Sequence, residues 1–469
     1  MSEELTTKSA TELAALIRSR AVSPVEVVEA HLRRIERINP SLNAIVTVSA
    51  DALEQARVAE AALMSGEIGP LLGLPLTVKD TIDTKGLRTT SGSRLRANHF
   101  PDRDATVVAR LKAAGAIILG KTNTAEMAAY YETDNPVFGR ANNPHNPLMT
   151  PGGSSGGEAA AIAACLSPAG IGSDLAGSIR LPAHFCGIAG LKPTTGRVPS
   201  DGHTPAVEGS LSLGTSIGPM ARTVADLALL FSIIADDAPL ELNDEQGGTL
   251  RGLRKAWYVS DGVAPVDEET ARAVERAADA LRDAGLEVDQ AEPPGVSRGL
   301  GLWLALFSHS VSRQLRGLYR GREGEAGPQV AAMVARISEE DQGFGGKVAA
   351  AERLAKAVVE RERLREELLR WMKTTPIIVA PVGATCAWPH GTHRVNVRGE
   401  SISVFRAFSY SQTFNVFGLP SVVVPAGRSA EGLPIGVQIV GRPFAERNVL
   451  AVAALLETIL GGWIRPPKF

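Results

Sequence analysis

A glycine- and serine-rich stretch over residues 151–180 carries the side chains with the clearest capacity for chemistry. It reads PGGSSGGEAAAIAACLSPAGIGSDLAGSIR and offers the hydroxyls of Ser154, Ser155 and Ser178. The consecutive amides of residues 175–178 could donate hydrogen bonds to an oxyanion, as an acyl-transfer site requires. Because glycine is costly where ordinary backbone suffices, the stretch predicts two turns that hold the backbone close to a reacting group.

The candidate base is a lysine far upstream. Residues 74–79 predict a buried strand that ends at Lys79, next to Asp80. One interpretation is structural: the lysine stem covers apolar surface, or its ammonium pairs with Asp80. The other is catalytic, because desolvation would lower the pKa of Lys79 and leave a neutral amine that accepts a proton. The residues alone leave both interpretations open.

Other side chains near the two turns have supporting roles. Asp174 and Arg180 flank Ser178, and we expect them to form an ion pair that braces the second turn, with Ser155 as a further support.

A loop rich in Asn, Pro and Tyr, over residues 122–150, is expected to cross the top of a sheet. Met127, Tyr130 and Tyr131 either line a pocket there or pack the loop down, and the sequence does not separate these two roles. Thr150, at the end of the loop, is a further candidate for substrate binding.

Two short motifs point elsewhere and are weaker. Residues 115–122, GAIILGKT, match a phosphate-binding loop letter for letter, but their apolar run favours a strand, and Gly115 fits the end of a helix. Residues 152–156, GGSSG, match the elbow of α/β-hydrolases, for which His390 or His393 would be the base. The stretch before that elbow reads as a loop, whereas the motif needs a strand.

Motifs spread along the chain resemble the amidase signature family. They are LPLTVKD with Lys79, PGGSSGGE, GSDLAGSIRLPAHFCGIAGLKPTTGRV, APVGA, FNVFGLPSVVVPAG and GLPIGVQIVG. The resemblance spans residues 12–457 and is weakest over residues 243–373. It implies an α/β fold with one large domain, in which helices cover both faces of a central mixed β-sheet.

The resemblance also implies a Ser-Ser-Lys triad that needs no histidine, metal or cofactor. Ser178 would be the nucleophile, Ser154 a bridging serine on a cis peptide, and Lys79 the ultimate base. Ser154 is chosen over Ser155 because it lies 24 residues before Ser178, the spacing of the family's pair. Such a triad forms an acyl-enzyme and would open amides and anilides to hydrolysis, with carbamates (urethanes) and esters chemically accessible.

One turn departs from the family pattern. Many relatives read Asp-x-Gly-Gly-Ser, whereas this chain reads Asp174-Leu175-Ala176-Gly177-Ser178. We expect the amides of Leu175, Ala176, Gly177 and Ser178 to form the oxyanion hole. Ala176 adds a methyl group where glycine is common, so its backbone must have a conformation that alanine tolerates.

Two alternatives remain within the same resemblance. The family includes the amidotransferase subunit that acts on glutamine and charged tRNA, but this chain has no match to that subunit's C-terminal Lys-Arg-Arg motif. A binding scaffold without catalysis is the other alternative, and the intact Lys79, Ser154 and Ser178 argue against it. The expected protein is a stand-alone hydrolase of a neutral, aromatic or hydrophobic substrate.

Composition sets outer limits on partners and location. With 44% hydrophobic and 21% charged residues, the 469-residue chain can bury a sizeable core, and a net charge of −2 offers no electrostatic case for nucleic acid or an anionic membrane. The start lacks the pattern of a secretory signal, so we expect a cytoplasmic protein with a small-molecule amide-type substrate and a homodimer left open. The three cysteines are odd in number and lack paired spacing, so they predict neither a disulfide framework nor a zinc site.

The 469 residues are expected to form one domain with four subregions. Residues 1–68 would be an N-terminal helical cover, and residues 69–240 the catalytic core. Residues 241–375 would be a helical insertion or flank, and residues 376–469 would complete the sheet with strands and a last helix.

Overall fold

The computed structural model describes residues 2–236, 252–340, 344–463 and 465–469. Its main sheet contains β1 (Ile45–Val48), β2 (Pro75–Lys79), β3 (Ile117–Thr122), β4 (Ala169–Asp174), β5 (Ala189–Lys192), β6 (Ser216–Ala221), β7 (Lys255–Trp257), β8 (Val288–Gln290), β9 (Ile377–Pro381), β12 (Ser421–Arg428) and β13 (Pro434–Gly441). These 11 strands lie in the order β1-β3-β2-β4-β6-β5-β12-β13-β9-β7-β8. β2 pairs in parallel with β3 and β4, and β7 with β8 and β9. The remaining pairs are antiparallel, so the sheet is mixed as expected.

Helices cover both faces of this sheet. One face packs against α2 (Ala10–Arg18), α5 (Thr106–Ala113), α8 (Val224–Ile234), α10 (Glu268–Asp283) and α17 (Glu446–Leu460). The other packs against α3 (Pro24–Leu42), α4 (Ala52–Met64), α6 (Gly156–Ala163), α7 (Arg180–Cys186) and α16 (Ser409–Val416). In β3, Ile118 lies in the first core while Ile117 and Leu119 lie in the second, because side chains alternate along a strand. The expected α/β fold is confirmed.

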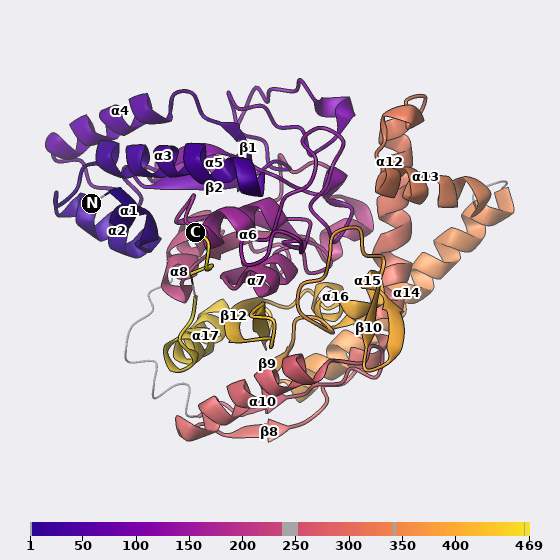
Figure 1. The fold of residues 1–469 in the computed structure, drawn as a ribbon. Helices are drawn as coiled ribbons and strands as arrows, with labels where there is room; N and C mark the ends of the chain where they lie inside the picture. The colour runs from indigo at the N-terminus through magenta and orange to yellow at the C-terminus, as the bar shows by residue number, and fades with distance from the viewer. Residues whose placement is uncertain (1, 237–251, 341–343, 464) are drawn as a thin grey trace.

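A group of helices projects beside the sheet, on the right of Figure 1. It comprises α11 (Gly299–Trp303), the π-helical turn η5 (Leu304–Ser308), α12 (His309–Tyr319), α13 (Pro328–Glu340) and α14 (Phe344–Trp371). The remaining elements are α1 (Ser2–Thr7), α15 (Val404–Ala407), the hairpin β10 (Arg394–Val397) with β11 (Glu400–Ser403), and the short 3₁₀ helices η1 (Arg94–Arg96), η2 (Glu126–Ala128), η3 (Gly209–Leu213), η4 (Val296–Arg298) and η6 (Glu323–Glu325).

The expected helical flank, residues 241–375, does more than cover the sheet. It contains α11–α14, but it also contributes β7 and β8, which form one edge of the main sheet. β7 pairs with β9 from the C-terminal part, and β8 pairs with β7. The expected boundary at residue 240 lies outside the described residues. Within the described part of the chain, no helix is long and apolar enough to cross a membrane.

The segment that matches a phosphate-binding loop is part of the sheet. Gly115 follows the end of α5 with a φ of +98°, the left-handed conformation that favours glycine after a helix. Ile117–Thr122 then forms the buried strand β3 rather than a loop that curls around phosphate. The match is therefore coincidental.

Candidate active site

The parallel pairing of β2 with β4 brings the candidate base to the candidate turn. Thr77 pairs with Gly170 and Val78 with Ile171, so both strands end at the same edge of the sheet. Lys79, the last residue of β2, is 0% exposed. It shares a strand face with Thr77, whose hydroxyl donates to the Glu158 carboxyl of α6, so Lys79 points toward the start of α6.

Two hydroxyls surround the amine of Lys79. Nζ lies 2.7 Å from Ser154 Oγ and 3.0 Å from Ser173 Oγ. Burial lowers the pKa of Lys79 to about 7, although the nearby Asp174 and Glu158 carboxylates oppose this shift. A substantial fraction of the amine is therefore neutral at neutral pH, as a proton acceptor must be.

The first glycine-rich turn places Ser154 between this amine and the cavity. The Gly153–Ser154 peptide bond is cis, in agreement with what the resemblance implies. At Gly153, a Cβ atom would lie 2.8 Å from the Tyr130 carbonyl oxygen, so the turn packs directly on the 122–150 loop. Ser155 faces another way: its amide donates to the Ser178 carbonyl at 3.2 Å and its hydroxyl to the Ser173 carbonyl at 3.3 Å.

The candidate nucleophile, Ser178, lies where the site meets the cavity. Ser178 is 7% exposed and lines the same cavity as Ser154. Ser154 Oγ and Ser178 Oγ share no hydrogen bond among the described residues. The amine of Lys79 and the Ser154 hydroxyl are thus in contact, whereas the hydroxyls of Ser154 and Ser178 are related only by lining the same cavity.

Asp174 and Arg180 form the expected brace. Both side chains are fully buried, and Arg180 donates from Nε to Asp174 Oδ2 at 3.1 Å and from Nη2 to Oδ1 at 3.0 Å. Burial alone would raise the pKa of Asp174, but the Arg180 guanidinium and its hydrogen bonds outweigh that effect and hold the pKa well below the usual range. Arg180 also contacts Asn415 and Gln438, which ties the turn to α16 and β13.

The carbonyls of Leu175, Ala176 and Gly177 in the second turn all accept hydrogen bonds, and these bonds orient the amides of the turn. Trp303 Nε1 donates to the Leu175 carbonyl at 2.9 Å, and the Tyr131 hydroxyl donates to the Ala176 carbonyl at 3.1 Å. The Gly177 carbonyl accepts from the Leu181 amide at 2.6 Å. Because C=O and N–H point in opposite directions in a trans peptide, the amides of Ala176 and the following residues turn away from these partners.

One of the four expected oxyanion donors is already occupied. The Gly177 amide donates to Asp174 Oδ1 at 2.8 Å, so this N–H is not available to an oxyanion. The amides of Leu175, Ala176 and Ser178 have no hydrogen-bond partner among the described residues. Gly177 instead serves the backbone, since its φ of +103° is a conformation that alanine rarely adopts.

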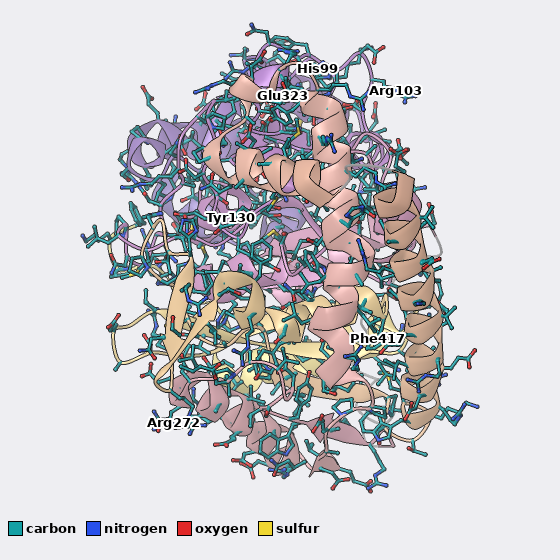
Figure 2. The ribbon with its side chains drawn as sticks, turned by 90° about the vertical axis from the view of Figure 1, so that its right-hand side faces the viewer. His99, Arg103, Tyr130, Arg272, Glu323 and Phe417 are labelled. Carbon is teal, nitrogen blue, oxygen red and sulfur yellow. The ribbon has the colours of Figure 1, made fainter. Side chains whose placement is uncertain are left out.

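The 122–150 loop supplies part of the cavity wall, and its last residue supports the first turn. Met127, Tyr130 and Tyr131 line a cavity of about 2110 Å³ together with Ser154 and Ser178. Thr150 does not belong to the described residues that line this cavity; it is buried, and its Oγ1 accepts from the Gly152 amide at 3.1 Å. Figure 2 shows Tyr130 between the N-terminal half of the ribbon and the C-terminal strands, on the side where α12–α14 lie.

The two histidines that the elbow motif would need have structural partners. His390 Nδ1 lies 2.9 Å from the Glu132 carboxylate, and His393 Nδ1 lies 2.7 Å from the Tyr130 hydroxyl. The stretch before Pro151 is loop, as expected, so no strand leads into that motif. The described residues contain no group of side chains that could hold a metal ion.

Three contributors were not anticipated from the sequence. Ser173 contacts Lys79, His203 contacts Ser173 at 2.9 Å, and Trp303 holds the second turn. Ser173 lies within the quoted GSDLAGS motif, where the strand's alternation could have indicated it. His203 and Trp303 come from distant loops and helices, and the sequence contains no signal that places them there.

Comparison with known proteins identifies the family of the chain. The family model described as Amidase matches residues 26–450. A glutamyl-tRNA(Gln) amidotransferase subunit of Roseiflexus sp. (strain RS-1) is 36% identical over 489 residues, covering 99% of this chain and 98% of its own length. Fatty-acid amide hydrolase 2 of Homo sapiens is 33% identical over 506 residues, covering 100% and 92%.

Solved structures give the same result. The structure of 6-aminohexanoate cyclic dimer hydrolase, in complex with its substrate, superposes with a TM-score of 0.84 at 31% identity and covers 99% of both chains. The family model and the identities above extend over nearly the whole chain. The chain therefore belongs to the amidase signature family and is a hydrolase of the amidase type.

Proposed function

We propose that this protein hydrolyses amide-type C–N bonds through Lys79, Ser154 and Ser178, with an acyl-enzyme intermediate. The observation that carries the proposal is the buried amine of Lys79, whose Nζ lies 2.7 Å from Ser154 Oγ. Burial lowers the pKa of this amine to about 7. Lys121 and Lys192 are also buried, but each of their amines donates to a backbone carbonyl. The amine of Lys79 instead contacts two hydroxyls, and both of these serines line the cavity.

In the proposed reaction, Ser178 Oγ attacks the substrate carbonyl carbon. Its proton passes to Ser154, and the proton of Ser154 passes to Lys79. The amides of Leu175, Ala176 and Ser178 stabilise the tetrahedral oxyanion. The C–N bond then breaks as the proton returns through Ser154 to the leaving nitrogen, and water repeats the sequence on the acyl-enzyme.

The cavity supports a substrate with an apolar group next to the reacting bond. Leu300, Trp303, Leu304 and Phe405 line it together with the loop tyrosines. Phe405 makes edge contacts with Tyr130 and Tyr131, at 5.8 and 5.1 Å between ring centroids. We therefore propose a neutral, hydrophobic or aromatic amide or anilide, with carbamates and esters as further substrates.

The test begins with a label that needs no knowledge of the substrate. A fluorophosphonate should react at Ser178 of the wild type, and Lys79→Ala should react at least about 100-fold more slowly. His390→Ala, which removes the base of the competing elbow motif, should react like the wild type. Labelling that survives Ser178→Ala would contradict the triad, and a wild type that never reacts would favour a binding scaffold.

A substrate panel then identifies the reaction. Anilides, primary amides, carbamates and esters with matched acyl groups should be compared by kcat/KM, with Ser178→Ala as the blank. Hydrolysis of a p-nitroanilide should survive EDTA. The expected cytoplasmic location and the open question of a homodimer stay predictions, and light scattering on the purified protein measures the second.

A second candidate function is favoured by the 36% identity to an amidotransferase subunit over 99% of the chain. In that case glutamine would be the amide donor, and ammonia release from free glutamine would exceed hydrolysis of every anilide in kcat/KM. We place it second because the cavity is wide and its wall includes the aromatic side chains of Tyr130, Tyr131, Trp303 and Phe405, which suits a larger apolar group.

A further inference from the structure

The amine of Lys79 faces two hydroxyls, and only one arrangement of protons lets it act as a base. Nζ lies 2.7 Å from Ser154 Oγ and 3.0 Å from Ser173 Oγ, its two hydrogen-bond partners in the described part of the chain. A neutral amine has two N–H groups and one lone pair, and only the lone pair accepts a proton. The hydroxyl that faces the lone pair therefore determines whether Lys79 can serve Ser154.

His203 determines where the proton of Ser173 points. His203 Nδ1 lies 2.8 Å from the Pro205 carbonyl oxygen, which only accepts, so Nδ1 carries the proton. Burial lowers the pKa of His203 to about 4, against the Pro205 hydrogen bond and with a smaller contribution from Lys79, so the ring is neutral. His203 Nε2 is then an acceptor, and Ser173, 2.9 Å away, donates its hydroxyl proton to it.

A serine hydroxyl has a single proton, and this fixes the direction of the hydrogen bonds that run from Lys79 through Ser173 to His203. Because Ser173 donates to His203, it can only accept from Lys79, and it takes one of the two N–H groups. We propose that His203 and Ser173 are positioning residues, which set the direction of the hydrogen-bond chain so that the lone pair of Lys79 faces the Ser154 hydroxyl. This inference rests on the proposed function, in which Lys79 is the base.

The fold holds His203 firmly over the end of β2. The Thr204 amide donates to the Thr81 carbonyl at 2.8 Å, and the Asp83 amide donates to the Gly202 carbonyl at 2.8 Å. His203 also forms an isolated β-bridge with Ile82, three residues after Lys79. The imidazole is thus fixed relative to the strand that carries the base, as a positioning residue requires.

The test uses the rate of fluorophosphonate labelling at Ser178, so it needs no known substrate. In His203→Phe, Ser173 loses its acceptor and can turn its proton to the lone pair of Lys79, so labelling should slow by about 10- to 100-fold. Adding Ser173→Ala removes the competing hydroxyl, and the double variant should react faster than His203→Phe alone. Ser173→Thr keeps a hydroxyl, so adding His203→Phe to Ser173→Thr should slow labelling by the same factor as His203→Phe does in the wild type.

The outcomes are separable. If the double variant reacts more slowly than His203→Phe, or if His203→Phe reacts like the wild type, the proposal is overturned. A merely structural role for His203 would slow labelling equally with Ser, Thr or Ala at position 173. The proposed function fails on different evidence, namely labelling that survives Ser178→Ala, while circular dichroism confirms that each variant is folded.

Discussion

The protonation state of Lys79 should control the rate through the neutral pH range. Burial lowers its pKa to about 7, and the carboxylates of Asp174 and Glu158 act in the opposite direction. Below that pH the amine is charged and cannot accept a proton from Ser154; above it the amine is neutral. We therefore expect labelling of Ser178 to rise between about pH 6 and 8 and then level off.

Lys79→Arg is the matching variant, because a guanidinium stays charged over the whole range. Its labelling should be at least about 100-fold slower and should lack the rise near neutral pH. A wild-type profile that is flat from about pH 6 to 9 would contradict a lysine base with a lowered pKa.

Ala176 should affect substrate choice rather than the existence of activity. It is 8% exposed, it lines the cavity, and it lies outside the positive-φ residues of the described chain. Ala176→Gly removes one methyl group from the wall beside the oxyanion donors. We expect activity to persist, with kcat/KM for bulky acyl groups rising about 2- to 10-fold relative to acetyl substrates. Complete loss of activity in this variant would refute the expectation.

At the scale of elements, α11 should position the second turn. Trp303 Nε1 donates to the Leu175 carbonyl at 2.9 Å, so the Ala176 amide of the same peptide points away from Trp303. Trp303→Phe loses this donor, so we expect kcat to fall about 3- to 30-fold. This decrease is smaller than the one expected when an oxyanion donor itself is removed.

Trp257→Phe is the matched control. Trp257 is buried in β7, and its Nε1 has no hydrogen-bond partner among the described residues. Its substitution should lower the melting temperature without lowering kcat. Equal effects of the two substitutions on kcat would mean that Trp303 contributes only packing.

Elements with a strong local pattern could be predicted from the sequence, and those defined by distant partners could not. The capping box at Ser23 and the apolar spacing after it predict α3, and the pattern over Glu446–Leu460 predicts the last helix. β5 and β6 lie in stretches that look turn-rich, because glycine and proline interrupt them. They are strands because β12 and β4 supply their neighbours.

The candidate site could likewise be predicted only in part. Family motifs include Lys79, Ser154 and Ser178, and their spacing distinguishes Ser154 from Ser155. His203 could not be predicted, because its role depends on the packing of residues 202–204 against the end of β2. The occupied Gly177 amide also depends on where the Asp174 carboxylate points, which only the folded turn determines.

At the scale of the whole molecule, the sheet joins segments that are far apart in the chain. β5 is bonded to β12, so the first half of the chain and the C-terminal part form one continuous sheet. Arg180 crosses the same junction, since it contacts Asp174 before it and Gln438 on β13. The site therefore depends on the C-terminal strands, although they supply none of the proposed reacting groups. Figure 1 shows these yellow elements beside α6 and α7.

Arg222 makes a second long-range connection, near the chain ends. Its guanidinium is buried and donates to the carbonyls of Thr6 at 3.3 Å, Ile162 at 3.2 Å and Ser167 at 3.1 Å, and it lies 5.2 Å from the ring centroid of Trp463. Arg222→Lys keeps the charge but not the planar set of donors, so buried carbonyls lose their partners. We expect a loss of about 2–4 kcal/mol in the free energy of unfolding, with the labelling rate of folded protein unchanged. Arg57→Lys, in an exposed pair with Glu54, should cost less than about 0.5 kcal/mol, and equal urea midpoints for the two variants would show that this connection does not stabilise the fold.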